Sequence, residues 1–149
     1  TDLIRVVIFD LDGTLLDRKT SLKRFIENQY ERMEVKNVSK NNYLSRFIEL
    51  DRHGYVWKDK VYKQLVEEFR ISQISWEALL TDYMENFASC AVAFPNTIEI
   101  LEWLKMKEIK VGMITNGLAN FQMRSIAALR IESYFDEILI SESPESVAD

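Results

Sequence analysis

Two aspartates stand where a short apolar segment of the chain gives way to a glycine. The segment Val6–Phe9 leads directly to Asp10 and Asp12, and Gly13 follows. Side chains alternate along a strand, so residues two apart point the same way, and both carboxylates would lie at the carboxyl edge of a sheet. Such a pair can divide nucleophilic attack and proton transfer between its members.

The same spacing predicts a metal site at Asp10 and Asp12. Two carboxylates so close repel each other, and a divalent cation or a split in protonation states relieves the repulsion. Mg²⁺ takes oxygen ligands and favours one or two carboxylates together with a substrate phosphate. The alternative interpretation is an ordinary Asp-Gly turn after a strand, because such dipeptides are common turn signals.

The residues IFDLDGTLLD, which run from Ile8 to Asp17, resemble the first motif of the haloacid dehalogenase superfamily of phosphoryl-transfer enzymes. The resemblance implies that Asp10 is the nucleophile that forms an aspartyl-phosphate. It implies that Asp12 is the general acid and base that protonates the leaving oxygen, and that its backbone carbonyl joins the Asp10 side chain in binding Mg²⁺. An Asp at position 12 also favours phosphate esters over haloacids or phosphonates as substrates.

A second candidate site follows the next predicted strand, Ile109–Ile114. That strand runs into Thr115, Asn116 and Gly117, and residues 118–129 have helical spacing. A hydroxyl and backbone N–H groups at a strand-to-helix turn suit a phosphate group. Thr115 matches the second motif of the family, whose Ser or Thr binds the transferring phosphoryl group. Asn116 and Gly117 fit the same turn, so all three are predicted to bind substrate.

The remaining motifs of the family have no counterpart in this sequence. Members carry a Lys or Arg after the third core strand, and then one or two acidic residues that complete the metal site. The third strand is predicted at 137–140, and no Lys or Arg follows Arg130. The acidic residues Glu142, Glu145 and Asp149 are predicted to belong to a solvated polar tail.

The fold predicted from these motifs is an α/β core with an insertion. Residues 16–93 carry apolar stripes at helical spacing, which predicts four amphipathic helices. The family resemblance identifies this insertion as an all-α helical cap, between core segments at 1–15 and 94–149. The core is expected to be a Rossmann-like parallel sheet that is truncated after its third strand, since members with such an insertion are considerably longer.

Three residues near the ends of predicted helices are expected to have specific roles or positions. Arg18 follows the first motif closely enough to reach a substrate anion. Asn96 is predicted to cap the helix after the insertion through its side chain. The single histidine, His53, is expected at the surface beside Gly54 rather than in a catalytic or metal site.

The charge and composition of the chain limit the kinds of partner that it is expected to bind. The chain has 19 basic and 24 acidic residues and a formal net charge of −5, which offers no general attraction for nucleic acid. No apolar segment is long enough to cross a membrane, and the sequence starts without a basic and apolar leader. These features predict a cytoplasmic protein with no nucleic-acid or membrane partner. The family resemblance implies that the partner is a small phosphorylated substrate.

Three functions remain open at this point. The first is a Mg²⁺-dependent phosphatase of the haloacid dehalogenase type, with this chain an incomplete and inactive fragment in one version. The second is a phosphomutase of the same family, and the third is a catalytically silent binding or regulatory module with the same fold. Without a fourth strand beside it, Val6–Phe9 is predicted to form an unpaired apolar edge that promotes homodimerisation or strand exchange.

Overall fold

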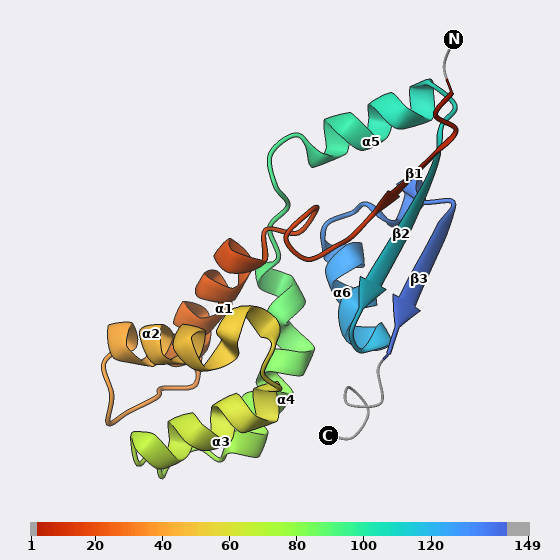
Figure 1. The fold of residues 1–149 in the computed structure, drawn as a ribbon. Coiled ribbons are helices and arrows are strands. Elements are labelled where there is room, and N and C mark those ends of the chain that lie inside the picture. The colour runs from red at the N-terminus through yellow and green to blue at the C-terminus, as the bar shows by residue number, and fades with distance from the viewer. Residues whose placement is uncertain (1–2, 143–149) are drawn as a thin grey trace. The chain divides into compact units, whose positions relative to one another are not determined.

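The structure is a computed structural model that describes residues 3–142. It divides into two compact units (Figure 1). The first holds the described residues up to Ser21 and those from Ala91 onward, and the second holds Leu22–Cys90. The first unit is α/β and the second is all-α. No helix in residues 3–142 is both long enough and apolar enough to span a membrane.

A parallel sheet of three strands, in the order β1-β2-β3, forms the centre of the first unit. The strands are β1 (Val6–Phe9), β2 (Lys110–Asn116) and β3 (Glu137–Ser141). The α/β fold with a parallel sheet is therefore confirmed. The second strand is longer than predicted, because Thr115 and Asn116 still pair with β3 instead of belonging to the turn. Within the described residues β1 is an edge strand, as expected.

Two helices cover one face of this sheet. They are α5 (Thr97–Met106), which precedes β2, and α6 (Ala119–Ala128), which precedes β3. Successive strands step in one direction across the sheet, so right-handed crossovers place both helices on the same side. On that side Val111 and Met113 are each 1% exposed.

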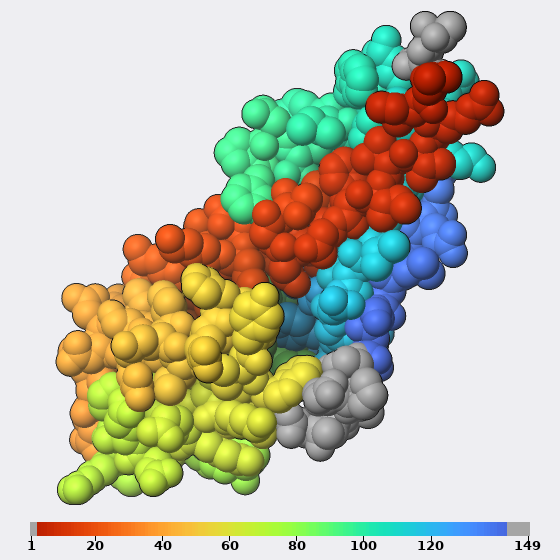
Figure 2. Space-filling model, in the orientation of Figure 1, coloured from red at the N-terminus to blue at the C-terminus, as the bar shows by residue number. Residues whose placement is uncertain are grey.

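The opposite face of the sheet is open. Ile8, Ile114 and Leu139 are 59%, 48% and 52% exposed. Together with Gly112 they line a shallow hollow. The space-filling view shows the red N-terminal segment that contains β1 at the molecular surface (Figure 2). Parallel sheets are usually covered on both faces, and here helices within residues 3–142 cover only one.

Asn96 precedes α5 but does not cap it in the predicted way. Its backbone is left-handed (φ 68°, ψ 9°), and its side chain makes no capping hydrogen bond. A capping side chain normally projects from an extended backbone toward the N–H groups of the first turn, and the left-handed conformation directs it elsewhere. The prediction for Asn96 was therefore wrong. The buried face of α5 agrees with the sequence, since Leu101 and Leu104 are 0% and 5% exposed.

The four predicted helices of the insertion are present. They are α1 (Arg18–Arg32), α2 (Lys40–Asp51), α3 (Lys58–Glu68) and α4 (Trp76–Asn86). The first turn of α1 still belongs to the first unit. Their apolar stripes form the core of the second unit, although one apolar residue of α2, Ile48, is 43% exposed. His53 is exposed in a short 3₁₀ turn after α2, as expected.

A buried amide organises the core of this helical unit. Gln29 is fully buried, and its Nε2 donates to Asp82 Oδ2 at 2.9 Å and to the Leu79 carbonyl at 3.1 Å. Its Oε1 accepts from the hydroxyls of Tyr43 and Tyr62, both at 2.9 Å. The amide thus donates two hydrogen bonds and accepts two. All of its hydrogen-bonding capacity is used, as is expected for a buried polar group.

Candidate active site

The backbone of the segment after β1 is folded around one carbonyl. The Leu11 carbonyl accepts hydrogen bonds from the N–H groups of Thr14, Leu15 and Leu16, at 3.2, 2.9 and 2.9 Å. Gly13 turns the chain with φ +80°, a conformation that side-chain-bearing residues resist. The Leu11 side chain is fully buried and anchors the turn. Its neighbours Asp10 and Asp12 therefore leave the sheet at the carboxyl end of β1.

The two aspartates have different environments. Asp10 is exposed, and its Oδ1 accepts a hydrogen bond from the Leu11 N–H at 2.8 Å. Asp12 is partly buried, and burial raises its pKa above the ordinary value. A hydrogen bond from Gln122 and the charge of Arg18 lower that pKa, while the charge of Asp10 raises it. A carboxyl with a raised pKa is suited to donate a proton.

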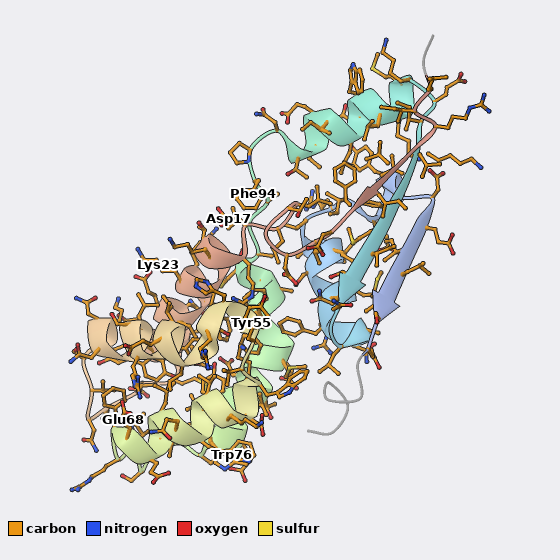
Figure 3. The ribbon with its side chains drawn as sticks, in the orientation of Figure 1. Asp17, Lys23, Tyr55, Glu68, Trp76 and Phe94 are labelled. Atoms are coloured by element: carbon orange, nitrogen blue, oxygen red, sulfur yellow. The ribbon has the colours of Figure 1, made fainter. Side chains whose placement is uncertain are left out.

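Asp17, the last residue of the first motif, has a structural role as the cap of a helix. Its carboxylate accepts from the Thr20 N–H at 3.1 Å and from the Thr20 hydroxyl at 2.9 Å, which caps the start of α1. Figure 3 labels Asp17 there and Phe94 on the segment that leads to α5. These two segments lie side by side, because Asp17 N–H donates to the Val92 carbonyl at 2.8 Å. Arg18 follows this capped position directly.

Gln122 of α6 connects the two predicted motifs. Its Nε2 lies 2.8 Å from Thr115 Oγ1, 3.1 Å from Asp12 Oδ2 and 3.1 Å from the Asn116 carbonyl oxygen. Thr115 is only 2% exposed, whereas Asn116 is exposed. The structure therefore brings Asp12, Thr115 and Asn116 together through one side chain.

Gly117 adjoins this cluster and makes room for it. Its φ is +136°, and a Cβ at this position would lie 3.3 Å from both Cγ and Cδ of Gln122. A contact at that distance is tighter than nine in ten real Cβ contacts. A side chain at residue 117 would therefore strain the turn and require the Gln122 side chain to shift by a few tenths of an ångström.

Gln122 was not among the site residues predicted from the sequence. The signal that could have found it is a polar residue on an apolar stripe. Ile126 is four residues after Gln122 on the same face of α6, and Leu118, four residues before it, directly precedes the helix. Gln122 is 4% exposed and Ile126 is fully buried. A polar residue on a buried helical stripe must find partners in the fold.

Glu142 is exposed, as predicted, and it also has a hydrogen-bond partner in the fold. Its Oε1 accepts a hydrogen bond from the Ala119 N–H at 2.6 Å, at the start of α6. A carboxylate at a helix N-terminus is favourable because the N–H groups there lack helical partners. The predicted tail residues Glu145 and Asp149 lie outside the described residues. One N–H of the helix end that was predicted to hold phosphate is thus already bonded to Glu142.

The donor atoms at this edge fit Mg²⁺. Asp10 and Asp12 offer carboxylate oxygens. The negative charge of Asp10 raises the pKa of Asp12, and a bound cation would relieve this repulsion. Across residues 3–142 no group of three or more His, Cys, Asp and Glu side chains could enclose a metal ion. Mg²⁺ commonly keeps several waters and uses one or two carboxylates with substrate phosphate, so a pair of aspartates matches its needs.

Comparison with known proteins places the chain in one family. The profile described as haloacid dehalogenase-like hydrolase matches residues 7–147. A phosphoglycolate phosphatase from Aquifex aeolicus is 28% identical over 139 residues, which cover 91% of this chain and 60% of that protein. A glyceraldehyde 3-phosphate phosphatase from Methanothermobacter thermautotrophicus is 28% identical, with 94% and 64% covered.

A solved structure has a similar fold. A structure named as a β-phosphoglucomutase from Thermotoga maritima superimposes with a TM-score of 0.72 at 21% sequence identity. The match covers 98% of this chain and 64% of that one. The chain thus spans about three fifths of the length of the relatives it matches.

Proposed function

The chain belongs to the haloacid dehalogenase-like hydrolases, and from this premise we propose that it carries the nucleophile and the proton-transfer group of a Mg²⁺-dependent phosphatase acting on a small phosphorylated metabolite. The observation that supports this most directly is the cluster at the carboxyl edge of the sheet. There a single buried side chain, Gln122, bonds both Asp12 and Thr115. The phosphatase relatives support the substrate class.

In the proposed reaction an Asp10 carboxylate oxygen attacks phosphorus and the bond from phosphorus to the leaving oxygen breaks. Since Asp10 Oδ1 already accepts from Leu11, Oδ2 is the oxygen proposed to attack. Asp12, protonated beforehand, gives its proton to the leaving oxygen. Water then attacks the aspartyl-phosphate, Asp12 takes a proton from that water, and phosphate leaves. Mg²⁺, when bound at the Asp10 carboxylate and the Asp12 carbonyl, would offset negative charge on the phosphoryl group.

The other predicted residues have proposed roles in binding. Thr115, Asn116 and Gly117 would hold the phosphoryl oxygens, and Arg18 would attract a substrate anion. Residues 1–15 and 94–149 are proposed to act as the catalytic core. Residues 16–93 are proposed to act as a cap that excludes water and recognises the leaving group. A cytoplasmic location stays a prediction from the sequence.

A phosphomutase is the second candidate, favoured by the structural neighbour named as a β-phosphoglucomutase. A requirement for a bisphosphate activator would distinguish it from a phosphatase. The third candidate is a catalytically silent binding or regulatory module with the same fold.

The test is hydrolysis of p-nitrophenyl phosphate, with and without Mg²⁺, by the parent chain, Asp10→Asn and Asp17→Asn. If Asp10 is the nucleophile, its variant loses activity, whereas Asp17→Asn keeps it because that residue caps α1. Activity that survives Asp10→Asn would remove Asp10 from the nucleophile's role. If all three proteins are folded and inactive, the result supports an incomplete site in this stretch of chain.

A further inference from the structure

We propose that Gln122 is a positioning residue that sets the direction of the Thr115 hydroxyl, so that Thr115 donates its hydrogen to a phosphoryl oxygen of the substrate. The inference rests on the proposed function, because it names what the Thr115 site does when phosphate is bound.

The orientation of the Gln122 amide follows from its partners. A backbone carbonyl can only accept a hydrogen bond, so the atom 3.1 Å from the Asn116 oxygen must be the NH₂ group. The same group lies 3.1 Å from the Asp12 carboxylate, which accepts as well when it is ionised. Gln122 therefore presents donors, and only donors, to this edge of the sheet, and its two N–H hydrogens are shared among three oxygens, of which Thr115 Oγ1 is the nearest.

The shortest of these contacts determines what Thr115 can do. Gln122 Nε2 donates to Thr115 Oγ1 at 2.8 Å, so the hydroxyl oxygen acts as an acceptor toward α6. A threonine hydroxyl has one hydrogen, and with its oxygen accepting from Gln122 that hydrogen is directed to another acceptor. A phosphoryl oxygen carries negative charge and accepts such bonds strongly.

The side chain of Gln122 is held firmly enough to impose this direction. It is 4% exposed, and it packs against Gly117 in a space that a Cβ would fill at 3.3 Å. Preorganised donors stabilise developing charge without reorganising during the reaction, and residues whose rotamers are fixed by packing provide that preorganisation. Gln122 contacts both Thr115 and the Asp12 carboxylate, so its effect on bound phosphate is indirect, and comparison with Thr115→Val isolates the part that passes through Thr115.

This dependence can be tested by a double-mutant cycle on binding of inorganic phosphate in the presence of Mg²⁺, measured by calorimetry. Gln122→Met keeps the volume and removes both donors, Thr115→Val removes the hydroxyl, and Asn120→Ala is a control on an exposed position of α6. We expect each of the first two changes to weaken phosphate binding by about tenfold, since a lost hydrogen bond to a charged group has an effect of this order. The control should bind like the parent.

The double variant gives the decisive result. If Gln122 acts through Thr115, the double variant binds phosphate no more weakly than Thr115→Val alone. The inference would be overturned if the fold-losses in phosphate affinity of the two single variants multiply in the double variant. It would also be overturned if Gln122→Met binds phosphate as tightly as the parent. Either result would leave the proposed function in place. Absence of phosphate binding by the folded parent would count against the proposed function as well.

A second measurement does not require phosphate or a stable Gln122→Met protein. The NMR signals of the Gln122 side-chain NH₂ group, recorded in the parent and in Thr115→Val, report the contact directly. We expect them to shift on Thr115→Val and to stay in place on Asn120→Ala. If the chemical shifts of the Gln122 NH₂ group are the same in Thr115→Val as in the parent, the 2.8 Å contact does not form in solution.

Discussion

The position that a Cβ would take on Gly117 lies 3.3 Å from the Cγ of Gln122, in a turn whose φ is +136°. Gly117→Ala therefore meets both backbone strain and a close contact. We expect it to lower the free energy of unfolding by about 1–3 kcal/mol, measured by urea denaturation.

Gly112→Ala is the matched control for this change. A Cβ there would be 3.7 Å from the Glu137 carbonyl oxygen and 3.8 Å from Ile8 Cγ1, which are ordinary contacts on the open face of the sheet. Its effect should stay within about 0.5 kcal/mol. Equal losses for the two variants would mean that the space beside Gln122 is not the cause.

Two buried serines should respond to alanine with opposite signs. Ser125 is 1% exposed and its Oγ has no hydrogen-bond partner in the described part of the chain. Because Ser125→Ala removes an unpaired buried hydroxyl and favours the helix, we expect a gain of about 1 kcal/mol in thermal unfolding experiments.

Ser21 is the contrasting position, fully buried but fully bonded. Its hydroxyl donates to the Asp17 carbonyl at 2.7 Å and accepts from the Val92 N–H at 2.8 Å. Ser21→Ala leaves both backbone groups without that partner, so we expect a loss of about 2 kcal/mol. A destabilised Ser125→Ala protein would contradict the sign predicted for that site.

The two tyrosines that bond Gln29 should be coupled. Burial raises the pKa of both Tyr43 and Tyr62, so both remain protonated donors to the same Gln29 oxygen. We expect Tyr43→Phe and Tyr62→Phe each to cost about 1 kcal/mol, because the other tyrosine still satisfies the oxygen. The double variant leaves that oxygen without a tyrosine donor, so its loss should exceed the sum of the single losses. Simple additivity in denaturation experiments would argue against a shared acceptor.

The stability of the helical unit should fall in acid because of Asp82. Burial raises the pKa of this carboxyl, but hydrogen bonds from Arg32, Gln29 and Asn86 outweigh burial and hold the pKa below its ordinary value. A group whose pKa is depressed in the folded state stabilises the fold above its unfolded pKa, and that contribution is lost as the pH falls through the folded pKa.

We therefore expect the melting temperature to decline as the pH falls below about 4, the range in which an unperturbed Asp titrates. Asp82→Asn should reduce the acid dependence and destabilise the protein by about 2 kcal/mol at neutral pH. Glu85→Gln, at an exposed position of the same helix, is the control and should follow the parent profile. If the melting temperature of Asp82→Asn declines in acid as it does in the parent, other carboxylates cause the acid dependence.

We propose that strand β1 promotes self-association. It is an edge strand in the described residues, and its Ile8 is 59% exposed. Exposed apolar edges recruit further strands, and a lysine on such an edge prevents this pairing. Light scattering should show a dimer or larger species for the parent and a smaller species for Ile8→Lys. Ile48→Lys, at a 43% exposed position of α2, should not change the parental mass.

Much of this fold was predictable because its signals are local. The apolar run Val6–Phe9, the Asp-Gly turn and the apolar stripes of four helices each depend on residues near one another in the chain. The positions of Asp10 and Asp12 at the carboxyl edge follow from that strand alone. Their catalytic roles, like those of Thr115 and Arg18, remain predictions, since they describe a reaction rather than a conformation.

Tertiary structure decided the features that join distant segments. Gln122 reaches Asp12 and Thr115 only because α6 packs beside the ends of β1 and β2, and Glu142 reaches α6 only because β3 ends beside it. The left-handed backbone of Asn96 and the open face of the sheet likewise depend on how the crossovers run. Local periodicity specifies which residues form helices and strands, whereas the partner of a buried polar group depends on which segments the fold brings into contact.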